Sequence, residues 1–277
     1  MNRSELGAAL RVLRQASGKE AKAVARSAVM SASKLSKIET GKLAPSADDV
    51  DRILTAIGVS RDVKAEYMEA ARAVATEATA WRLIQRAGLH KAQKQLQAIE
   101  TRMSLLRLFQ PALVPGLLQT PEYMRAILSR HADLTEETVR RTISARLERQ
   151  QVLYDAGKTL RFVITEPVLR WLIVPPLVMV GQIDRLITLS RLPNIDIRVV
   201  PLAGPKHDIP NHAFVIRDDR AVSVETVHAD VTVTDPRDVA LYAAKFDGFA
   251  EQALSGDSMR VVLEGIRDAF LREQETG

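Results

Sequence analysis

Short polar and basic side chains gather in one predicted helix near the N-terminus, from Ser31 to about Thr40. Lys37 could donate hydrogen bonds to guanine O6 or N7, and Ser33 could donate to or accept from several bases. Ala32 could contact a thymine methyl group. These are the residue types by which a helix in the major groove reads base edges. The alternative, that the lysines form an ordinary solvated helix face, stays open.

Basic charge is concentrated in the same part of the chain. The formal net charge is +5 over 277 residues. Residues 1–45 hold nine Lys or Arg against three acids, a net charge of +6, so the remaining 232 residues sum to −1. A small basic terminal unit joined to a neutral body is the distribution expected of a nucleic-acid-binding module.

A second group of residues with possible chemistry lies in the segment GPKHDIPNH, which contains His207, Asp208 and His212. Two histidines five residues apart beside a carboxylate could bind a metal ion, but the spacing matches no zinc-protease signature. A solvated loop is the interpretation that we favour. We expect neither a metal site nor a cofactor.

Enzyme signatures are missing from the sequence. It has no cysteine, no G-x-S-x-G, no G-x-x-x-x-G-K-[ST] and no G-x-G-x-x-G. Glu166 and Glu225 each end a predicted strand and would form a carboxylate pair if the strands were neighbours; strand ends in solvent are the simpler interpretation. We therefore expect a protein that is not an enzyme.

The elements that position these residues follow from hydrophobic spacing. The first 76 residues predict five short helices and no strand. Two of them, Glu20–Ser27 and Ser31–Thr40, are separated by a tight turn, as in a helix-turn-helix. Gly41 and Gly58 are expected to end the third and fourth helices. The small residues of AVATEATA, 73–80, predict a loosely held helix or a linker at a domain boundary.

From residue 81 onward the pattern mixes helices and strands. Helices are predicted near residues 92–109, 121–130, 135–156, 176–191 and, in two pieces broken at Ser255-Gly256, 236–273. Strands are predicted at 160–166, 195–202, 212–218 and 221–227. The fold class is therefore α+β: an all-α five-helix bundle in residues 1–78, followed in residues 79–277 by a larger mixed α/β domain with a central sheet flanked by helices.

The string SASKLSKIETG, from Ser31 to Gly41, resembles the Cro/repressor or xenobiotic-response-element class of helix-turn-helix regulators. The resemblance implies base contacts by Ala32, Ser33 and Lys37. The residues expected at DNA phosphates are Arg14, Lys34, Ser36, Thr40 and Lys42.

Two positions depart from the pattern of that class. Ala21 replaces a glutamine that often contacts phosphate early in the second helix, and Val29 replaces the turn glycine. Because a β-branched residue is disfavoured at positive φ, Val29 predicts a turn with different backbone geometry.

The segment FQPALVPGLLQTPEYM, residues 109–124, resembles actinobacterial regulators that join a helix-turn-helix to a long C-terminal domain marked by vPGLLQT-x-x-Y-A-R. The resemblance extends through Arg146, Arg149-Gln150, TEPVLR, DIRVVPL and VETVHADV, although Met124 stands where the pattern has alanine. Such regulators are described as antitoxin-like, often encoded beside a small partner protein, and connected with development and antibiotic production. Their effector is undefined.

The same string also has a structural interpretation. Pro115-Gly116 predicts a turn, and Thr120 is an N-cap candidate before Pro121 at the first helical position. A ligand-contacting role for the string stays open as the alternative. Four aromatic residues could line a ligand pocket or belong to the core: Trp81, Tyr123, Tyr154 and Trp171.

Together these features predict a regulator that binds double-stranded DNA as a homodimer. The C-terminal domain would mediate dimerisation and sense a small protein or small molecule; the effector-binding residues are unknown. The alternative is an antitoxin that mainly neutralises a small partner protein encoded nearby and binds DNA for autoregulation.

We expect a cytoplasmic, nucleoid-associated protein with no membrane partner. The longest apolar run, Trp171–Gly181, has 11 residues and two prolines. A membrane helix needs about 20 residues, and the N-terminus lacks the apolar core of a secretion signal.

Overall fold

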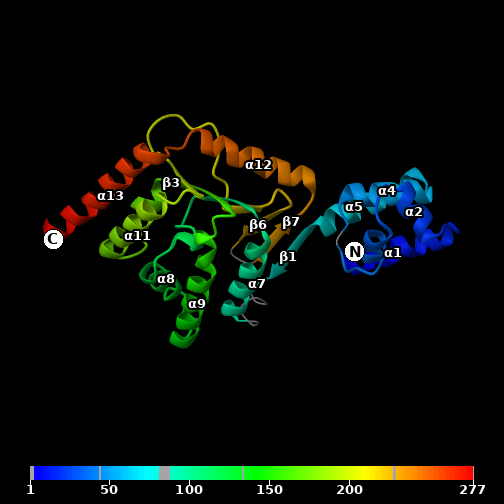
Figure 1. The fold of residues 1–277 in the computed structure, drawn as a ribbon, viewed down its shortest axis with the longest axis horizontal. Helices are drawn as coiled ribbons and strands as arrows, with labels where there is room; N and C mark the ends of the chain where they lie inside the picture. The colour runs from blue at the N-terminus through cyan, green and yellow to red at the C-terminus, as the bar shows by residue number, and fades with distance from the viewer. Residues whose placement is uncertain (1–2, 44, 81–87, 133, 227–228, 277) are drawn as a thin grey trace. The chain divides into compact units, whose positions relative to one another are not determined.

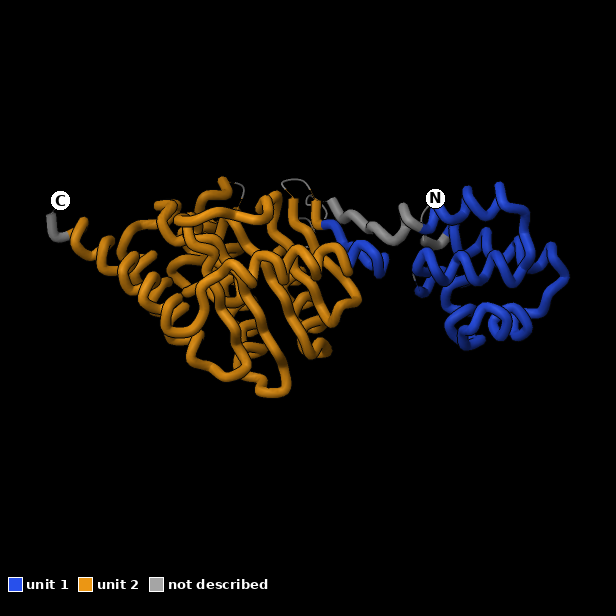
Figure 2. Tube along the Cα trace, turned by 90° about the horizontal axis from the view of Figure 1, so that it is seen from above, with its two compact units in different colours: residues 1–78, 231–239 blue, residues 79–230, 240–277 orange. Residues whose placement is uncertain are grey.

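The computed structural model describes residues 3–43, 45–80, 88–132, 134–226 and 229–276. The chain forms two compact units (Figure 2). Unit 1 comprises residues 1–78 and 231–239, and unit 2 comprises residues 79–230 and 240–277. The first division along the chain thus falls between Ala78 and Thr79, within the AVATEATA segment. The grouping of residues 231–239 with unit 1 was not expected from the sequence.

The five predicted helices of unit 1 are confirmed. They are α1 (Arg3–Ala16), α2 (Ala21–Ser27), α3 (Ala32–Glu39), α4 (Ala47–Ile57) and α5 (Arg61–Ala75). One buried hydrophobic cluster joins them; its members include Leu6, Leu10, Val24, Leu35, Ile38, Val50, Ile53 and Leu54. These residues recur at helical spacing, which is why the pattern could be recognised in the sequence.

Local hydrogen bonds and close contacts set the ends and spacing of the helices. The Ser31 hydroxyl accepts from the Lys34 amide and begins α3, and Gly58 ends α4 with φ of 87°. Gly7 allows α1 to approach α3, because a Cβ built on Gly7 would lie 2.2 Å from the Ile38 carbonyl oxygen. The recognition-helix candidate α3 is therefore held against α1 at a position that only glycine can occupy.

Unit 2 is a mixed α/β domain, as predicted (Figure 1). Its first half contains α7 (Leu89–Arg102), β2 (Leu105–Gln110), η1 (Gly116–Leu118), α8 (Pro121–Leu128), α9 (Glu136–Arg149), η2 (Gln150–Tyr154) and β3 (Thr159–Thr165). Its second half contains α10 (Pro167–Arg170), α11 (Pro176–Leu189), β4 (Ile195–Val200), β5 (Phe214–Arg217), β6 (Ala221–Glu225), α12 (Pro236–Glu251) and α13 (Gly256–Thr276). Strands β1 (Thr76–Ala80) and β7 (Ala229–Val233) lie where the chain passes from one unit to the other.

The strands of unit 2 follow the order β6-β5-β2-β3-β4. β2, β3 and β4 are parallel, with Leu108, Phe162 and Ile197 side by side, whereas β5 is antiparallel to both β2 and β6. The parallel strands are joined by helical crossovers, and the antiparallel strands β5 and β6 by a short turn. This combination produces a mixed sheet.

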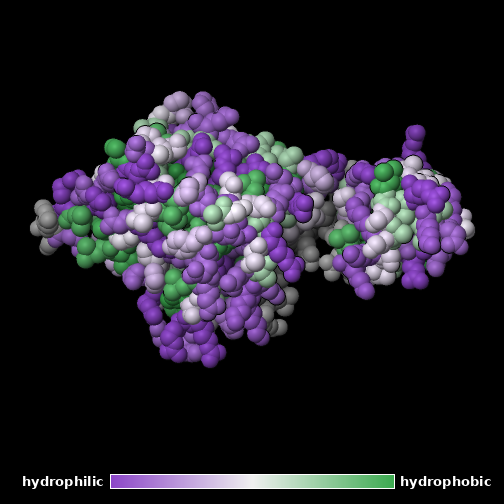
Figure 3. All heavy atoms as spheres, in the orientation of Figure 1, coloured by the Kyte–Doolittle hydropathy of each residue, from purple (hydrophilic) through white to green (hydrophobic). Residues whose placement is uncertain are grey.

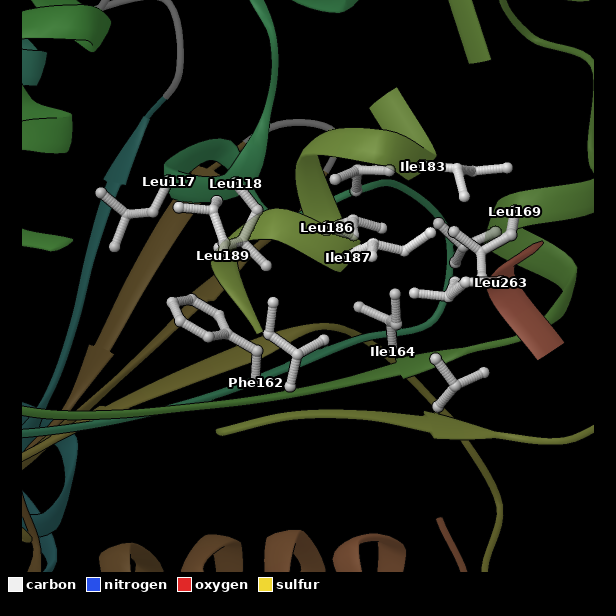
Figure 4. Close-up of a cluster of buried hydrophobic side chains, with 14 of the residues drawn as sticks. Leu117, Leu118, Phe162, Ile164, Leu169, Ile183, Leu186, Ile187, Leu189 and Leu263 are labelled. Carbon is white, nitrogen blue, oxygen red and sulfur yellow. The ribbon is translucent and has the colours of Figure 1, made fainter. Parts of the chain in front are cut away.

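Helices cover both faces of the sheet. On one face, Phe162 and Ile164 of β3 pack with residues of η1, α10, α11 and α13 (Figure 4). On the other face, Phe109 stacks on Phe249 of α12 with ring centroids 4.0 Å apart. Arg161 lies over the Phe246 ring of the same helix, 5.3 Å from its centroid. The central strands are thus buried on both sides.

Three details of the predicted pattern were wrong. The helix predicted through residue 109 ends at Arg102, and Leu105–Gln110 is the buried strand β2. A short apolar run buried on both faces has no alternation, so it resembles the continuation of a helix. Residues 76–80 form β1 instead of a helix or linker, and β7 was not predicted.

Candidate nucleic-acid interface

Helix α3 has one exposed and one buried face. Leu35, Ile38 and Glu39 are buried against the rest of unit 1. The exposed residues are Ala32, Ser33, Ser36, Lys37 and Thr40. At 100° per residue these five positions cover one continuous arc of the helix. We call this arc the exposed α3 face; it contains all three residues predicted to contact bases.

Two lysines at this face are available to a ligand. Lys37 lies on the exposed α3 face and Lys42 follows the helix, and both are exposed. Neither ammonium group forms an ion pair with a residue in the part of the chain that the structure describes. The Thr40 hydroxyl donates to the Ser36 carbonyl oxygen at 2.8 Å. Donation from Thr40 to a phosphate therefore requires that this internal bond be released.

Arg14, a predicted phosphate contact, is instead engaged inside unit 1. Its Nε and Nη2 atoms donate to the two Glu39 carboxylate oxygens at 2.6 and 2.9 Å, and its Nη1 donates to the Lys19 carbonyl oxygen at 3.2 Å. The hydrogen bond that Arg14 donates to Glu39 raises the pKa of Arg14 above its ordinary value. This bidentate pair fastens the last turn of α3 to α1. The geometry argues against a direct phosphate contact by Arg14.

Lys34 is also paired. Its Nζ lies 2.6 Å from Oδ1 of Asp49 on α4. The Asp49 side chain is buried, whereas the Lys34 side chain is 40% exposed. The two residues are 15 positions apart, and nothing in the sequence indicated the pair.

The turn between α2 and α3 corrects the prediction for Val29. Its φ is 53°, the left-handed conformation that glycine adopts at this position, so the turn keeps the usual geometry. The Met30 amide donates to the Ala25 carbonyl at 3.0 Å and the Val29 amide to the Arg26 carbonyl at 3.2 Å. This is the Schellman arrangement of bonds, and it holds the exposed Val29 in a conformation unfavourable for a β-branched residue.

The other basic residues of unit 1 are also either bonded inside the unit or exposed. Lys19 donates to the Ala56 and Ile57 carbonyl oxygens at 2.6 and 2.9 Å, where it caps the end of α4. Lys22 and Arg26 of α2 are exposed. Neither residue was predicted to contact DNA, although their charge was a signal in the sequence.

Two of the residues considered as metal ligands, His212 and Asp208, instead contact side chains of α12. His212 Nε2 lies 3.0 Å from the Tyr242 hydroxyl. Asp208 pairs with Lys245 at 2.6 Å, and the hydrogen bond from Lys245 lowers the pKa of Asp208. Among the described residues no group of three His, Asp or Glu side chains is arranged to hold a metal ion.

The two carboxylates considered for chemistry have different surroundings. Glu166 is buried; it contacts Arg170 Nε at 2.6 Å and accepts from the Leu202 amide at 2.8 Å. Desolvation, reinforced by Asp230, raises the pKa of Glu225, while Arg146 opposes this change. In the sheet, β2 and β5 lie between β3, which Glu166 follows, and β6, which Glu225 ends. The strands are therefore not neighbours, which was the condition for a carboxylate pair.

The PGLLQT string is held from within the fold. Gln150 donates to the Gln119 carbonyl oxygen at 2.8 Å. Gln182 donates to the Leu118 carbonyl oxygen and accepts from the Thr120 amide, each at 2.8 Å. Thr120 is the N-cap of α8, as predicted. These contacts support the structural interpretation of the string.

The arginines of the same resemblance are internal as well. Arg149 contacts both carboxylate oxygens of Glu100 at 2.7 Å, and Arg146 donates to Gln119 Oε1 at 3.1 Å. Desolvation lowers the pKa of Arg146 to about 10, so its guanidinium stays charged at neutral pH. Both side chains lock α9 to neighbouring elements.

Of the four aromatic residues, the three that the structure describes differ in exposure. Tyr123 is fully buried, whereas Tyr154 and Trp171 are 58% and 64% exposed. Trp81 lies outside the described residues, as does His228 of the VETVHADV segment.

Comparison with family models identifies the larger part of the chain. Residues 93–265, more than half of the sequence, match the model described as a domain of unknown function, DUF5753. The chain belongs to the DUF5753 family. Residues 5–67 of this DUF5753 protein match the model described as a helix-turn-helix domain, which includes all of α2, α3 and α4. The exposed α3 face therefore lies within the part of the chain that matches a helix-turn-helix domain.

Other comparisons give more distant likenesses. No curated protein matches the DUF5753 chain. Among solved structures, it is similar to TrmBL2, an archaeal chromatin protein with a novel mode of DNA binding, at 13% identity and a TM-score of 0.33. This match covers 71% of the chain and 62% of TrmBL2, so the chain spans less than two thirds of that protein.

Two bacterial structures show similarly low scores. Nuc from Salmonella typhimurium, a phospholipase D family member, has 12% identity and a TM-score of 0.36. NucT from Helicobacter pylori has 11% identity and a TM-score of 0.38. Each match covers 65% of this chain and 98% of the other. Scores this low establish neither a shared fold nor a shared activity. Among the helices that the structure describes, none has the length and apolar character needed to cross a membrane.

Proposed function

We propose that this DUF5753 protein is a sequence-specific DNA-binding transcriptional regulator of the Cro/repressor type. The observation that carries the proposal is the exposed α3 face, on the helix that follows the α2–α3 turn in the helix-turn-helix domain. It combines short side chains, through which a helix can approach base edges, with a lysine that pairs with no described residue. The apolar face of the same helix is fully used in the core of unit 1.

The proposed roles follow from exposure and pairing. Ala32, Ser33 and Lys37 contact base edges in the major groove. Ser36 and Lys42 contact phosphates, and Thr40 does so after release of its internal hydrogen bond. Arg14 and Lys34 are each paired with a carboxylate inside unit 1, so we do not include them among the residues that contact DNA.

We further propose that the regulator acts as a homodimer in the cytoplasm, at the nucleoid. A two-fold symmetric pair would bind a pseudo-palindrome with half-site centres about 34–36 Å apart, or a multiple of that spacing. Unit 2 would provide dimerisation and receive a signal from a small molecule or a small protein. Exposed apolar side chains support a protein partner, because Trp171, Leu172 and Leu177 lie in a stretch without charged residues.

The same exposed stretch favours a second candidate function, an antitoxin that neutralises a small partner protein. The visible surface is mostly hydrophilic, with hydrophobic residues gathered near α13 of unit 2 (Figure 3).

Purification of the tagged full-length chain from its native cells distinguishes the antitoxin from the regulator. A stoichiometric small protein lost in a Trp171→Ser, Leu172→Ser variant supports the antitoxin, and a homodimer alone supports the regulator.

The test of the main proposal is in-cell mapping of the DNA fragments bound by the full-length protein. The Lys37→Ala variant is mapped in parallel, and a Lys91→Ala variant on α7 serves as a charge-matched control outside the helix-turn-helix. We expect a palindromic motif that is lost with Lys37→Ala and kept with Lys91→Ala. Diffuse binding that neither substitution changes would contradict the proposal.

A further inference from the structure

The Lys34–Asp49 pair joins a basic side chain of α3 to an acidic side chain of α4. Lys34 Nζ lies 2.6 Å from Asp49 Oδ1. The Lys34 side chain is 40% exposed, so solvent and a large ligand can reach it, whereas the Asp49 side chain is 9% exposed. Lys34 and Lys37 are the two lysines of α3. Lys34 is paired, whereas Lys37 forms no ion pair with any residue that the structure describes.

Asp49 is fixed in place by its other oxygen. Oδ2 accepts from the Ser46 amide at 3.2 Å, and the Asp49 amide donates to the Ser46 hydroxyl at 3.0 Å, which together form a capping box. A carboxylate in the first turn of a helix is also stabilised by the helix dipole. Asp49 therefore cannot follow the Lys34 ammonium to a new position, and departure of the ammonium would leave a buried carboxylate without its counter-ion.

Lys34 stands at the flank of the exposed α3 face. At 100° per residue, its position on the helix lies about 60° beyond that of Lys37, on the side of α4. When a helix occupies the major groove, its central face meets base edges and its flanks face the sugar–phosphate backbones. The position of Lys34 is thus that of a phosphate-contacting residue, but its charge is already neutralised.

We propose that Asp49 withholds Lys34 from the DNA backbone and thereby limits the sequence-independent part of DNA binding. This inference rests on the proposed function. An unpaired ammonium adds one released counterion to every complex, on any sequence, whereas the Lys34–Asp49 pair adds none. Base reading by the exposed α3 face then contributes a larger share of the total affinity.

The experiment measures binding of the full-length chain to a random-sequence duplex of about 20 base pairs by fluorescence anisotropy at several NaCl concentrations. Four proteins are compared: wild type, Lys34→Gln, Asp49→Asn and the double variant. Lys34→Gln is expected to leave the slope of log K against log salt unchanged. Asp49→Asn is expected to steepen the slope by about 0.9, and the double variant to return to the wild-type value.

Asp48→Asn provides a matched control. Asp48 lies in the same turn of α4, is 58% exposed and pairs with Arg52 instead of α3. The Asp48→Asn substitution removes the same charge but leaves the Lys34–Asp49 pair intact. In the Asp48→Asn background, Lys34→Gln must therefore still leave the slope of log K against log salt unchanged. Thermal unfolding of each variant verifies that unit 1 remains folded.

Two results would overturn the inference: a slope that falls by about 0.9 in Lys34→Gln alone, or no effect of Lys34→Gln in the Asp49→Asn background. The comparison of Lys34→Gln with wild type leaves Asp49 unchanged. It therefore tests the inference even if Asp49→Asn lowers the stability of unit 1. Failure of the wild-type chain to bind the duplex at low salt would contradict the proposed function itself.

Discussion

The two units use their basic side chains in different ways. In unit 2, Arg149 is paired with Glu100, whose side chain is 1% exposed, and Arg107 pairs with Asp219 and Asp247. At the exposed α3 face of unit 1, Lys37 is exposed and pairs with no described residue. A buried pair fixes elements to one another, whereas an exposed unpaired charge remains available to a ligand. Pairing, more than the number of basic residues, therefore distinguishes an interface from a core.

The same distinction holds within unit 1. Arg14, Lys19 and Lys34 all contribute to the basic charge of residues 1–45, yet each is held by an internal carboxylate or carbonyl group. Lys37 and Lys42 are not held in this way by any described residue. The electrostatic footprint in the sequence thus includes charges that position the interface as well as charges that form it.

The largest expected effect tests the paired charges of unit 2. Replacing Glu100 by Gln leaves Arg149 without its carboxylate, with Arg217 4.0 Å from the same oxygen. Breaking a buried pair costs about 3–5 kcal/mol. Urea unfolding followed by tryptophan fluorescence measures this cost, because both tryptophans lie beyond residue 78. Glu148→Gln, an exposed carboxylate on α9, should change stability by less than about 0.5 kcal/mol; equal effects would contradict the comparison.

A second substitution tests how unit 1 holds α3. Gly7→Ala brings a Cβ against the Ile38 carbonyl oxygen, so the two helices must move apart. The expected cost is about 1–3 kcal/mol. Hydrogen–deuterium exchange should become faster in both α1 and α3, and Ala8→Ser, at an exposed position of the same helix, should leave α3 unaffected. Unchanged exchange in α3 after Gly7→Ala would show that the contact does not hold the helix.

A third substitution should stabilise unit 1. Val29→Gly removes a β-branched residue from a backbone with φ of 53°. Relief of left-handed strain, partly offset by the greater freedom of glycine in the unfolded chain, gives an expected gain of about 1 kcal/mol. Val12→Gly makes the same chemical change at an exposed position inside α1, where it should cost about 0.4 kcal/mol. Thermal unfolding compares the two, and a loss of stability in both would contradict the account of the turn.

The smallest expected effect is on the stability of the unpaired lysines. Lys37→Ala and Lys42→Ala should each change the free energy of unfolding by less than about 0.5 kcal/mol, because neither ammonium contributes an internal contact to a described residue. Chemical denaturation of the full-length chain measures this quantity. A fall in the free energy of unfolding of more than about 1 kcal/mol would show that these lysines form stabilising internal contacts, as the paired residues do.

Much of the fold was predictable where the signals are local. The five helices of unit 1 follow from apolar spacing and from caps such as Ser31, Ser46 and Gly58. Strand β2 was mistaken for helix because LLRLFQ is apolar almost throughout, and period alone cannot separate a doubly buried strand from a helix. The exposed α3 face follows from the same spacing, because the apolar residues Leu35 and Ile38 lie three positions apart and both are buried.

The pairing of the candidate residues was not predictable. Arg14 and Glu39 are 25 positions apart, and Lys34 and Asp49 are 15 apart, so each contact depends on how two helices pack. The conformation of Val29 was mistaken for a different reason. Its side chain disfavours positive φ, but the hydrogen bonds that close the turn outweigh that preference.

The most direct test of the central claim compares the DNA affinities of Lys37→Ala and Lys42→Ala, using the motif from in-cell mapping and a random duplex at several salt concentrations. Lys37→Ala should lose about 1–3 kcal/mol on the motif, with little loss on random DNA, and relax one base position. Lys42→Ala should lose affinity equally on both duplexes and reduce the salt slope by about one. Equal losses on both duplexes for both variants would contradict base reading by the exposed α3 face.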